Sequence, residues 1–352
     1  MTRGAAVAIV LMILLVALNV PVEAHVPEFP EGGESLEKAV RIEDPTKSWV
    51  VYSDLHGGGS PHYYLLTMKQ GERLFVSLTV PQHYIERGFQ PSMALIGPSI
   101  EDNGTLPSYV QVPEGSGAMV LTGPLPDRPE YEPFSPSAFY ELGEIVLEAP
   151  QDGDYYIAVF DEGTGGNYAL AVGSRESFTA KEWLLVPISS VSIYLWEGQD
   201  LLMVLAPSVL TFGVGLAAML GTSRRRIQPV DVLWVLATGA GLLMLASAAS
   251  FIYQMLWSLS QTGAEVTAAV TVIFAVLAIV LGLSALRVAH RERPMGKVPT
   301  SSRIILLAIG GFGLLLWAGW VIGPVIAIVT AVLPGGLLTR QLGRTRPARD
   351  AR

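Results

Sequence analysis

The chain of 352 residues is half hydrophobic, contains no cysteine and carries a formal net charge of −8. The absence of cysteine excludes disulfides, thiolate catalysis and cysteine-based metal or iron–sulfur sites. The charge is divided unevenly, with 26 acidic against 9 basic side chains in residues 25–200 and 4 against 13 in residues 201–352. The acidic part has no basic surface for nucleic acid, and basic residues beside apolar segments indicate membrane topology.

Residues 1–24 are typical of an export signal. A basic residue, Arg3, precedes an apolar run from Ala5 to Val20, and a small-residue cleavage site ends at Ala24. We expect cleavage after Ala24, which leaves His25 as the first residue of the mature chain. An uncleaved membrane anchor is the alternative.

Residues 25–182 are predicted to form an exported, all-β sandwich of jelly-roll type. Short segments of alternating character, such as Leu74–Val80, recur between turn signals rich in glycine and aspartate. The proline- and glutamate-rich residues 124–136 are expected to be loops. The candidate strands are Trp49–Ser53, Tyr63–Met68, Leu74–Val80, Ser92–Ile96, Ala118–Thr122, Ile145–Glu148, Tyr155–Phe160 and Tyr168–Val172.

Two stretches of this region resemble bacterial pre-peptidase C-terminal (PPC-like) domains. The run His62-Tyr63-Tyr64 with Gly71–Leu78 resembles their early hairpin, and Ala149–Val159 with Gly166–Val172 resembles their closing hairpin. The resemblance implies a jelly-roll module that serves binding or secretion, and it implies no particular activity. Residues 82–140 depart from the family pattern, so no ligand surface transfers to them.

The histidines of the exported segment are candidate metal ligands. After cleavage, the free α-amine and imidazole of His25 would chelate one copper ion, with a second imidazole from His56, His62 or His83. Nitrogen donors in this arrangement suit Cu(II), and it resembles the histidine brace of copper monooxygenases. The alternative is that cleavage happens to leave a histidine and that the other three lie on loops and a strand edge, with no cofactor bound.

No catalytic motif accompanies these residues. The sequence lacks the Gly-x-Ser-x-Gly, His-Glu-x-x-His and Gly-x-x-x-x-Gly-Lys patterns. Hydrolases with a nucleophile elbow, zinc proteases of the helix type and phosphate-loop enzymes therefore receive no support, and a non-enzymatic role is favoured.

The remainder of the chain is predicted to be membrane-associated. Residues 183–199 mix apolar and small polar side chains and are expected to form an amphipathic segment at the outer interface. Residues 200–338 are expected to form a membrane domain, and residues 339–352 a basic cytoplasmic tail. The five expected membrane helices are 201–221, 232–257, 266–288, 304–319 and 323–338.

The basic clusters predict the orientation of these helices. Arg224–Arg226 follow the first helix directly, so this end is cytoplasmic and the β region is outside. As one helix, residues 304–338 would be roughly 52 Å long, whereas a hydrocarbon core measures about 30 Å. We therefore expect a helical hairpin that breaks near Gly319–Pro324, with a single long tilted helix as the alternative.

These patterns predict a membrane-anchored cell-surface protein whose ectodomain binds a ligand or partner without catalysis. Small residues, such as Gly213, Gly239 and Gly319-x-x-x-Gly323, let helices in the lipid bilayer approach closely, either within the bundle or against other membrane subunits. A copper-binding protein or copper-enzyme subunit is one alternative. A permease for small neutral solutes is another, although the helices carry almost no charged residue of the kind transporters use.

Overall fold

The computed structural model describes residues 25–57, 59–225, 230–291 and 297–341. The predicted export signal and the end of the basic tail lie outside the described residues. The chain forms two compact units, and each is described by itself. The first contains the described residues up to Asp200 together with Met255–Ala268, and the second contains Leu201–Gln254 and the described residues from Ala269 onward.

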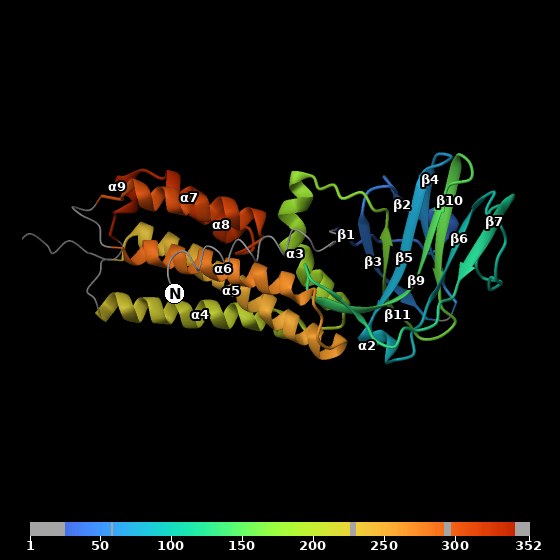
Figure 1. The fold of residues 1–352 in the computed structure, drawn as a ribbon, viewed down its shortest axis with the longest axis horizontal. Coiled ribbons are helices and arrows are strands. Elements are labelled where there is room, and N and C mark those ends of the chain that lie inside the picture. Colours follow the sequence, from blue (N-terminus) through green and yellow to red (C-terminus); the bar gives the residue numbers. More distant parts are fainter. Residues whose placement is uncertain (1–24, 58, 226–229, 292–296, 342–352) are drawn as a thin grey trace, which may run out of the picture. The chain divides into compact units, whose positions relative to one another are not determined.

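The first unit is a sandwich of two β-sheets, which confirms the predicted all-β architecture (Figure 1). One sheet has the strand order β1-β3-β11-β5-β9-β8, and the other has the order β2-β4-β10-β6-β7. The strands are β1 (Val26–Glu28), β2 (Val40–Ile42), β3 (Trp49–His56), β4 (His62–Met68), β5 (Arg73–Pro81), β6 (Ser92–Pro98), β7 (Ser116–Leu121), β8 (Glu130–Glu132), β9 (Ser137–Glu148), β10 (Gly153–Phe160) and β11 (Gly165–Val172). Three helices belong with them: η1 (Leu36–Lys38), α2 (Gln82–Ile85) and α3 (Ala180–Trp196).

The core between the sheets comes from alternate positions along the strands. On β5, Leu74, Val76, Leu78 and Val80 are each at most 1% exposed. Successive side chains of a strand point to opposite faces, so these four share the inward face. Burying one such side chain stabilises the fold by about 1.5–3 kcal/mol. Because this energy favours apolar residues at every inward position, the alternation of apolar and polar residues predicted the strand well.

The long strand β9 was only partly predicted because its alternation is interrupted. Leu78 pairs with Gly143, whereas the next residue, Thr79, pairs with Glu141, so Leu142 is an extra residue in β9. Such a β-bulge shifts the side-chain period by one position. Leu142 is nevertheless buried in the core, and the pairing continues on both sides of the bulge.

One expectation about this region was wrong. Residues 124–136 are not entirely loop, because β8 forms within them and pairs with β9; a strand of three residues is too short to show a period. Within each of the two stretches that resemble PPC-like domains, the two strands do not pair with each other. β4 and β10 lie in one sheet, while β5 and β11 lie in the other, so the chain crosses between the sheets at each of these turns.

Helix α3 follows the last strand and includes most of the segment predicted at 183–199. It begins earlier because Thr179 caps it: the Thr179 hydroxyl accepts a bond from the Glu182 backbone N–H, and the Glu182 carboxylate accepts one from the Thr179 N–H. This reciprocal pair is a capping box. The helix ends before Gly198, whose φ of 91° suits glycine.

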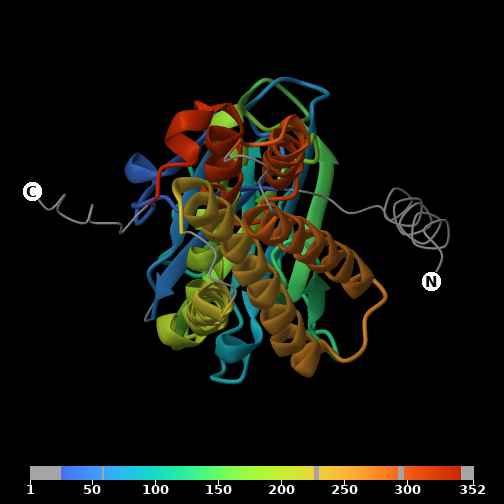
Figure 2. The same ribbon diagram turned by 90° about the vertical axis from the view of Figure 1, so that its left-hand side faces the viewer.

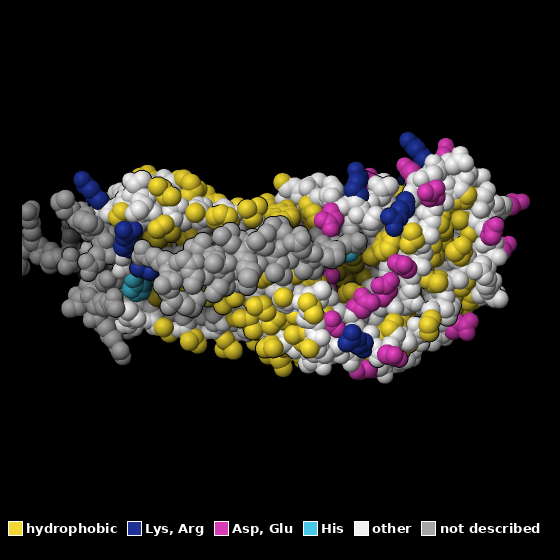
Figure 3. Space-filling model, viewed as in Figure 1, with side chains coloured by type: hydrophobic (Ala, Val, Ile, Leu, Met, Phe, Trp, Pro, Cys, Tyr) yellow, Lys and Arg dark blue, Asp and Glu magenta, His cyan; other side chains and the backbone are white. Residues whose placement is uncertain are grey.

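The helices after Asp200 are α4 (Leu201–Arg225), α5 (Val232–Thr262), α6 (Ala268–His290), α7 (Thr300–Leu315), α8 (Ile322–Val332) and α9 (Gly335–Leu338). Among the described residues, three helical segments are long and apolar enough to cross a membrane: Leu201–Ser223, Val232–Thr262 and Ala268–His290. Hydrophobic side chains cover these helices, whereas acidic side chains gather over the strands (Figure 3).

The last apolar stretch forms two helices, α7 and α8, which lie side by side (Figures 1 and 2). The Arg303 guanidinium, near the start of α7, donates hydrogen bonds to the carbonyls of Ala331 and Leu333 at 2.6 and 2.7 Å. These bonds hold the end of α8 beside the start of α7, so the pair is antiparallel. At the turn between them, the Gly319 N–H donates to the Ser247 hydroxyl at 2.8 Å.

The helix ends differ from those expected at 304–319 and 323–338. The turn occupies residues 316–321, earlier than expected, and Trp317, Trp320 and Val321 adopt positive φ there. Pro324 lies inside α8, where the first turn of a helix tolerates proline. Pro334 instead separates α8 from α9, because a proline disfavours helical backbone in the residue before it.

Candidate functional site

A polar cleft lies on the β-sandwich where three segments meet. Its volume is about 540 Å³, within the usual range for small-molecule sites. The end of β3 contributes one wall, α2 and the turn after it contribute a second, and the start of β11 contributes a third. The lining residues are Asp54, Leu55, His56, Gly57, Tyr84, Arg87, Thr164, Gly165 and Gly166.

The glycine wall of the cleft is shaped by a tight turn and by close packing. The Asp161 carboxylate accepts hydrogen bonds from the N–H groups of Gly163 and Gly165, at 2.9 and 3.2 Å. A Cβ atom at Gly166 would lie 2.7 Å from the Phe89 ring and 2.8 Å from the Tyr84 ring. Only glycine lets the backbone approach these rings so closely, and buried Phe89 in turn anchors the turn that carries Arg87.

Charged groups of both signs line the cleft around Tyr84. The Asp54 carboxylate lies 3.4 Å from the His56 imidazole, and both side chains are exposed. Arg87 is exposed and forms no ion pair with another described residue. Burial raises the pKa of Tyr84, the Arg87 guanidinium acts to lower it, and the Asp54 carboxylate acts to raise it. The Tyr84 hydroxyl is therefore close to both charges.

The end of α3 packs behind the same three segments. The Asn167 side chain acts to lower the pKa of Tyr84, and its amide donates to the Trp196 carbonyl at 2.7 Å. The Trp196 indole N–H lies 3.1 Å from the Tyr168 carbonyl and 3.3 Å from that of Ser53. Strands β3 and β11 therefore line the cleft on one side and hold α3 on the other.

One buried carboxyl group, that of Glu197, lies near this end of α3, and a half-buried one belongs to Glu132 on β8. Glu197 is 7% exposed; its carboxylate accepts from the Ala138 N–H at 2.9 Å and from the Gln199 amide at 3.0 Å. Burial raises the pKa of Glu197 to about 8, and it raises the pKa of Glu132 to about 7. Burial is the largest cause in both cases, because an apolar surrounding disfavours the charged form. Both groups also act to raise the pKa of Tyr194.

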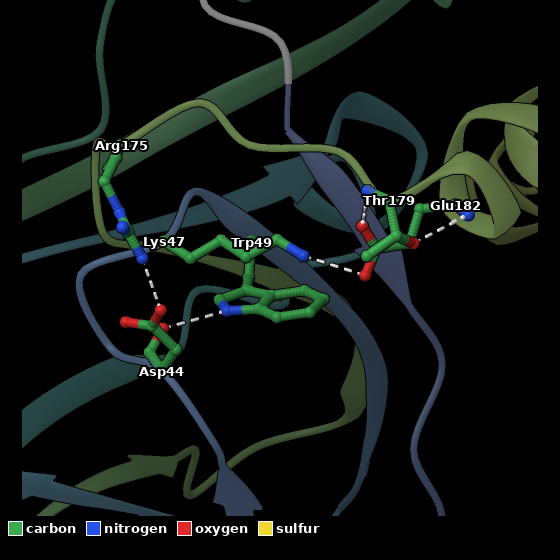
Figure 4. A network of polar contacts seen from close by, with 6 residues as sticks. All are labelled: Asp44, Lys47, Trp49, Arg175, Thr179 and Glu182. Atoms are coloured by element: carbon green, nitrogen blue, oxygen red, sulfur yellow. Dashed lines mark hydrogen bonds and ion pairs between the residues drawn. The ribbon is translucent and has the colours of Figure 1, made fainter.

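The start of α3 is held by a separate polar network (Figure 4). Lys47 is 8% exposed, and its ammonium lies 2.8 Å from the Glu182 carboxylate and 4.0 Å above the Trp49 ring. Trp49 donates to the Asp44 carbonyl at 3.0 Å, and Arg175 pairs with the Asp44 carboxylate at 2.5 Å. Burial acts to raise the pKa of Glu182, but the bonds from Lys47 and the cap outweigh it and lower that pKa.

The histidines predicted as metal ligands lie in separate settings. The His25 imidazole is 2.5 Å from the Ser48 hydroxyl, and His56 pairs with Asp54 at the cleft. His62 is 8% exposed on β4, and His83 lies on α2. Among the residues that the structure describes, no group of three or more histidine, aspartate or glutamate side chains could hold a metal ion.

His62 belongs to a hydrogen-bonded network inside the sandwich. Its Nδ1 lies 3.1 Å from the Tyr168 hydroxyl, which is 2.7 Å from the Tyr64 hydroxyl. Burial lowers the pKa of His62, because it disfavours the imidazolium. This histidine is therefore a hydrogen-bond partner of the buried tyrosine hydroxyls. Copper binding through His25 stays a prediction.

Sequence reasoning found the glycine turn of the cleft but not its charged residues. Gly165-Gly166 is one of the glycine-rich turn signals between the predicted strands, whereas Asp54, Tyr84 and Arg87 belong to no motif. Arg87 lies in the turn after the four-residue helix α2, which is too short to show a helical period. The buried Glu197 also gave no signal, since a glutamate near a helix end is usually solvated.

No protein-family model matches the chain, and no curated protein matches it significantly in sequence.

Proposed function

We propose that the protein is a membrane-anchored, exported binding protein whose β-sandwich holds a small polar ligand in the cleft between β3, α2 and β11. In this proposal the sandwich lies outside the cell, and the helices after Asp200 anchor it with the C-terminus in the cytoplasm. The PPC-like resemblance of the sandwich supports a binding role. The basic residues after the first and third long helices support the orientation.

The cleft is the observation that carries this proposal. It combines a ligand-sized volume with an aromatic ring and charges of both signs, which are the groups that orient small ligands in proteins. Its polar side chains Asp54, His56 and Arg87 are exposed and so remain accessible to a ligand from solvent. The proposal includes no chemical step, because the lining shows no nucleophile held by a base.

A ligand screen on the full-length protein in detergent tests the proposal. Thermal unfolding is measured with a panel of sugars, polyols, carboxylates, amines and amino acids at millimolar concentration, because a ligand that binds only the folded state raises the melting temperature. The variant Thr164→Trp fills the cleft from its rim, and Thr105→Trp adds the same side chain at an exposed position outside it.

We expect at least one solute to stabilise the unmodified protein and Thr105→Trp but not Thr164→Trp. A panel with no stabilising solute would contradict the proposal. Equal stabilisation of both variants would place the binding outside the cleft and would contradict it as well.

A further inference from the structure

Two oppositely charged side chains line the cleft together with one aromatic ring, that of Tyr84. Arg87 lies in the turn after α2, Asp54 lies on β3, and both charges act on the pKa of Tyr84. Asp54 and His56 are 66% and 81% exposed at their side chains, so they face solvent rather than the core. The cleft therefore offers one cationic and one anionic contact beside an aromatic ring.

Arg87 is the more informative of these residues. It forms no ion pair with another described residue, although the exported segment holds 26 acidic side chains against 9 basic ones. A guanidinium binds a carboxylate through two parallel hydrogen bonds. In a strongly acidic domain, an exposed arginine at a cleft is thus a suitable contact for a ligand carboxylate.

The same acidic surface limits which carboxylates bind well. The net charge of −17 over residues 25–200 repels a purely anionic ligand at long range. A purely cationic ligand would be attracted, but it would lie beside Arg87. A zwitterion has no net charge to be repelled, and it matches both contacts at once.

The remaining lining indicates the rest of the ligand. The Tyr84 ring provides apolar surface next to the charged groups, and the volume of about 540 Å³ exceeds what a ligand as small as glycine fills. From these features we infer that the cleft binds a free α-amino acid with a large side chain, whose carboxylate contacts Arg87 and whose ammonium contacts Asp54. This inference rests on the proposed function and specifies its ligand class.

Three matched probes separate the two charge contacts. L-phenylalanine carries both charges, 3-phenylpropionate lacks the ammonium, and 2-phenylethylamine lacks the carboxylate. Each is titrated calorimetrically into the full-length protein in detergent at pH 7. The variants are Arg87→Gln and Asp54→Asn, and the matched controls are Arg73→Gln and Asp127→Asn, which are exposed and lie outside the cleft.

We expect L-phenylalanine to bind about tenfold more tightly than either analogue, since one hydrogen-bonded charge contact contributes about this factor. Arg87→Gln should weaken L-phenylalanine about tenfold but should not weaken 2-phenylethylamine, which has no carboxylate to contact Arg87. Asp54→Asn should weaken L-phenylalanine similarly and leave 3-phenylpropionate unchanged. The two controls should bind all three probes as the unmodified protein does.

An analogue that binds as tightly as L-phenylalanine would overturn the inference, and so would L-phenylalanine binding that neither cleft variant weakens. Absence of heat with all three probes would overturn it too. The solute panel then shows whether the proposed function also fails. A neutral or singly charged solute whose stabilisation is lost in Thr164→Trp would leave the proposed function standing without the amino acid.

Discussion

Raising the pH should weaken the β-sandwich through Glu197. A carboxyl with a pKa of about 8 in the folded protein and about 4.5 in the unfolded chain binds more protons when folded. The stabilisation that Glu197 contributes is therefore fully present below about pH 4.5. It falls as the pH rises toward about 8 and is absent above that. At 1.36 kcal/mol for each tenfold change in an equilibrium, the whole loss is about 5 kcal/mol.

The structure explains why no neighbour offsets this cost. Glu197 acts on the pKa values of Tyr52 and Tyr194, and neither of these groups supplies a positive charge. The carboxylate keeps only the bonds from Ala138 and Gln199. The ionised form is therefore short of partners, and Glu132 adds a smaller effect of the same sign because its pKa is also raised.

Urea unfolding of the full-length protein in detergent, followed by tryptophan fluorescence, measures this effect. Between pH 6 and pH 8 the Glu197 contribution is about 2 kcal/mol, which lowers the midpoint by about 1 M urea for a typical slope near 2 kcal/mol per molar. Glu197→Gln keeps the shape of the side chain without its titration, so it should be more stable than the unmodified protein at pH 8. Glu148→Gln, at an exposed position, serves as the control. An unchanged pH dependence in Glu197→Gln would refute the reasoning.

Three further changes test other parts of the structure. Glu182→Gln removes the charge that pairs with buried Lys47 and should lower the free energy of unfolding by about 1–3 kcal/mol. Urea unfolding would show this as a lower midpoint. An unchanged midpoint would mean that the network of Figure 4 does not stabilise the fold. Ser247→Ala leaves the Gly319 N–H without its hydroxyl partner and should lower the stability of the helical unit by about 1–3 kcal/mol, which a lower melting temperature would show. Ser247→Thr keeps a hydroxyl and should lower the stability less. A reporter enzyme fused after Arg352 should be active only on the cytoplasmic side, because the arginines of the tail favour that side; external activity would contradict the proposed topology.

Much of the fold could be predicted because it depends on local patterns. The alternation at Leu74–Val80 reflects which side of one strand faces the core, and the apolar length of Leu201–Ser223 reflects what a membrane-crossing helix needs. Both are properties of neighbouring residues. The short strands β1 and β8, and the bulge at Leu142, escaped prediction because each depends on a partner strand and not on its own sequence.

The candidate site depends on tertiary structure for a related reason. Asp54, Arg87 and Gly165 are far apart in the sequence, and the pairing of β3 with β11 in one sheet, next to the turn after α2, brings them to one cleft. Nor does the sequence around Glu197 show that Ala138 would be its hydrogen-bond donor or that burial would raise its pKa. Solvent exposure and proximity are set by how the strands and α3 pack together. Local patterns therefore determined the classes of structure, and packing decided which polar groups meet and in what environment.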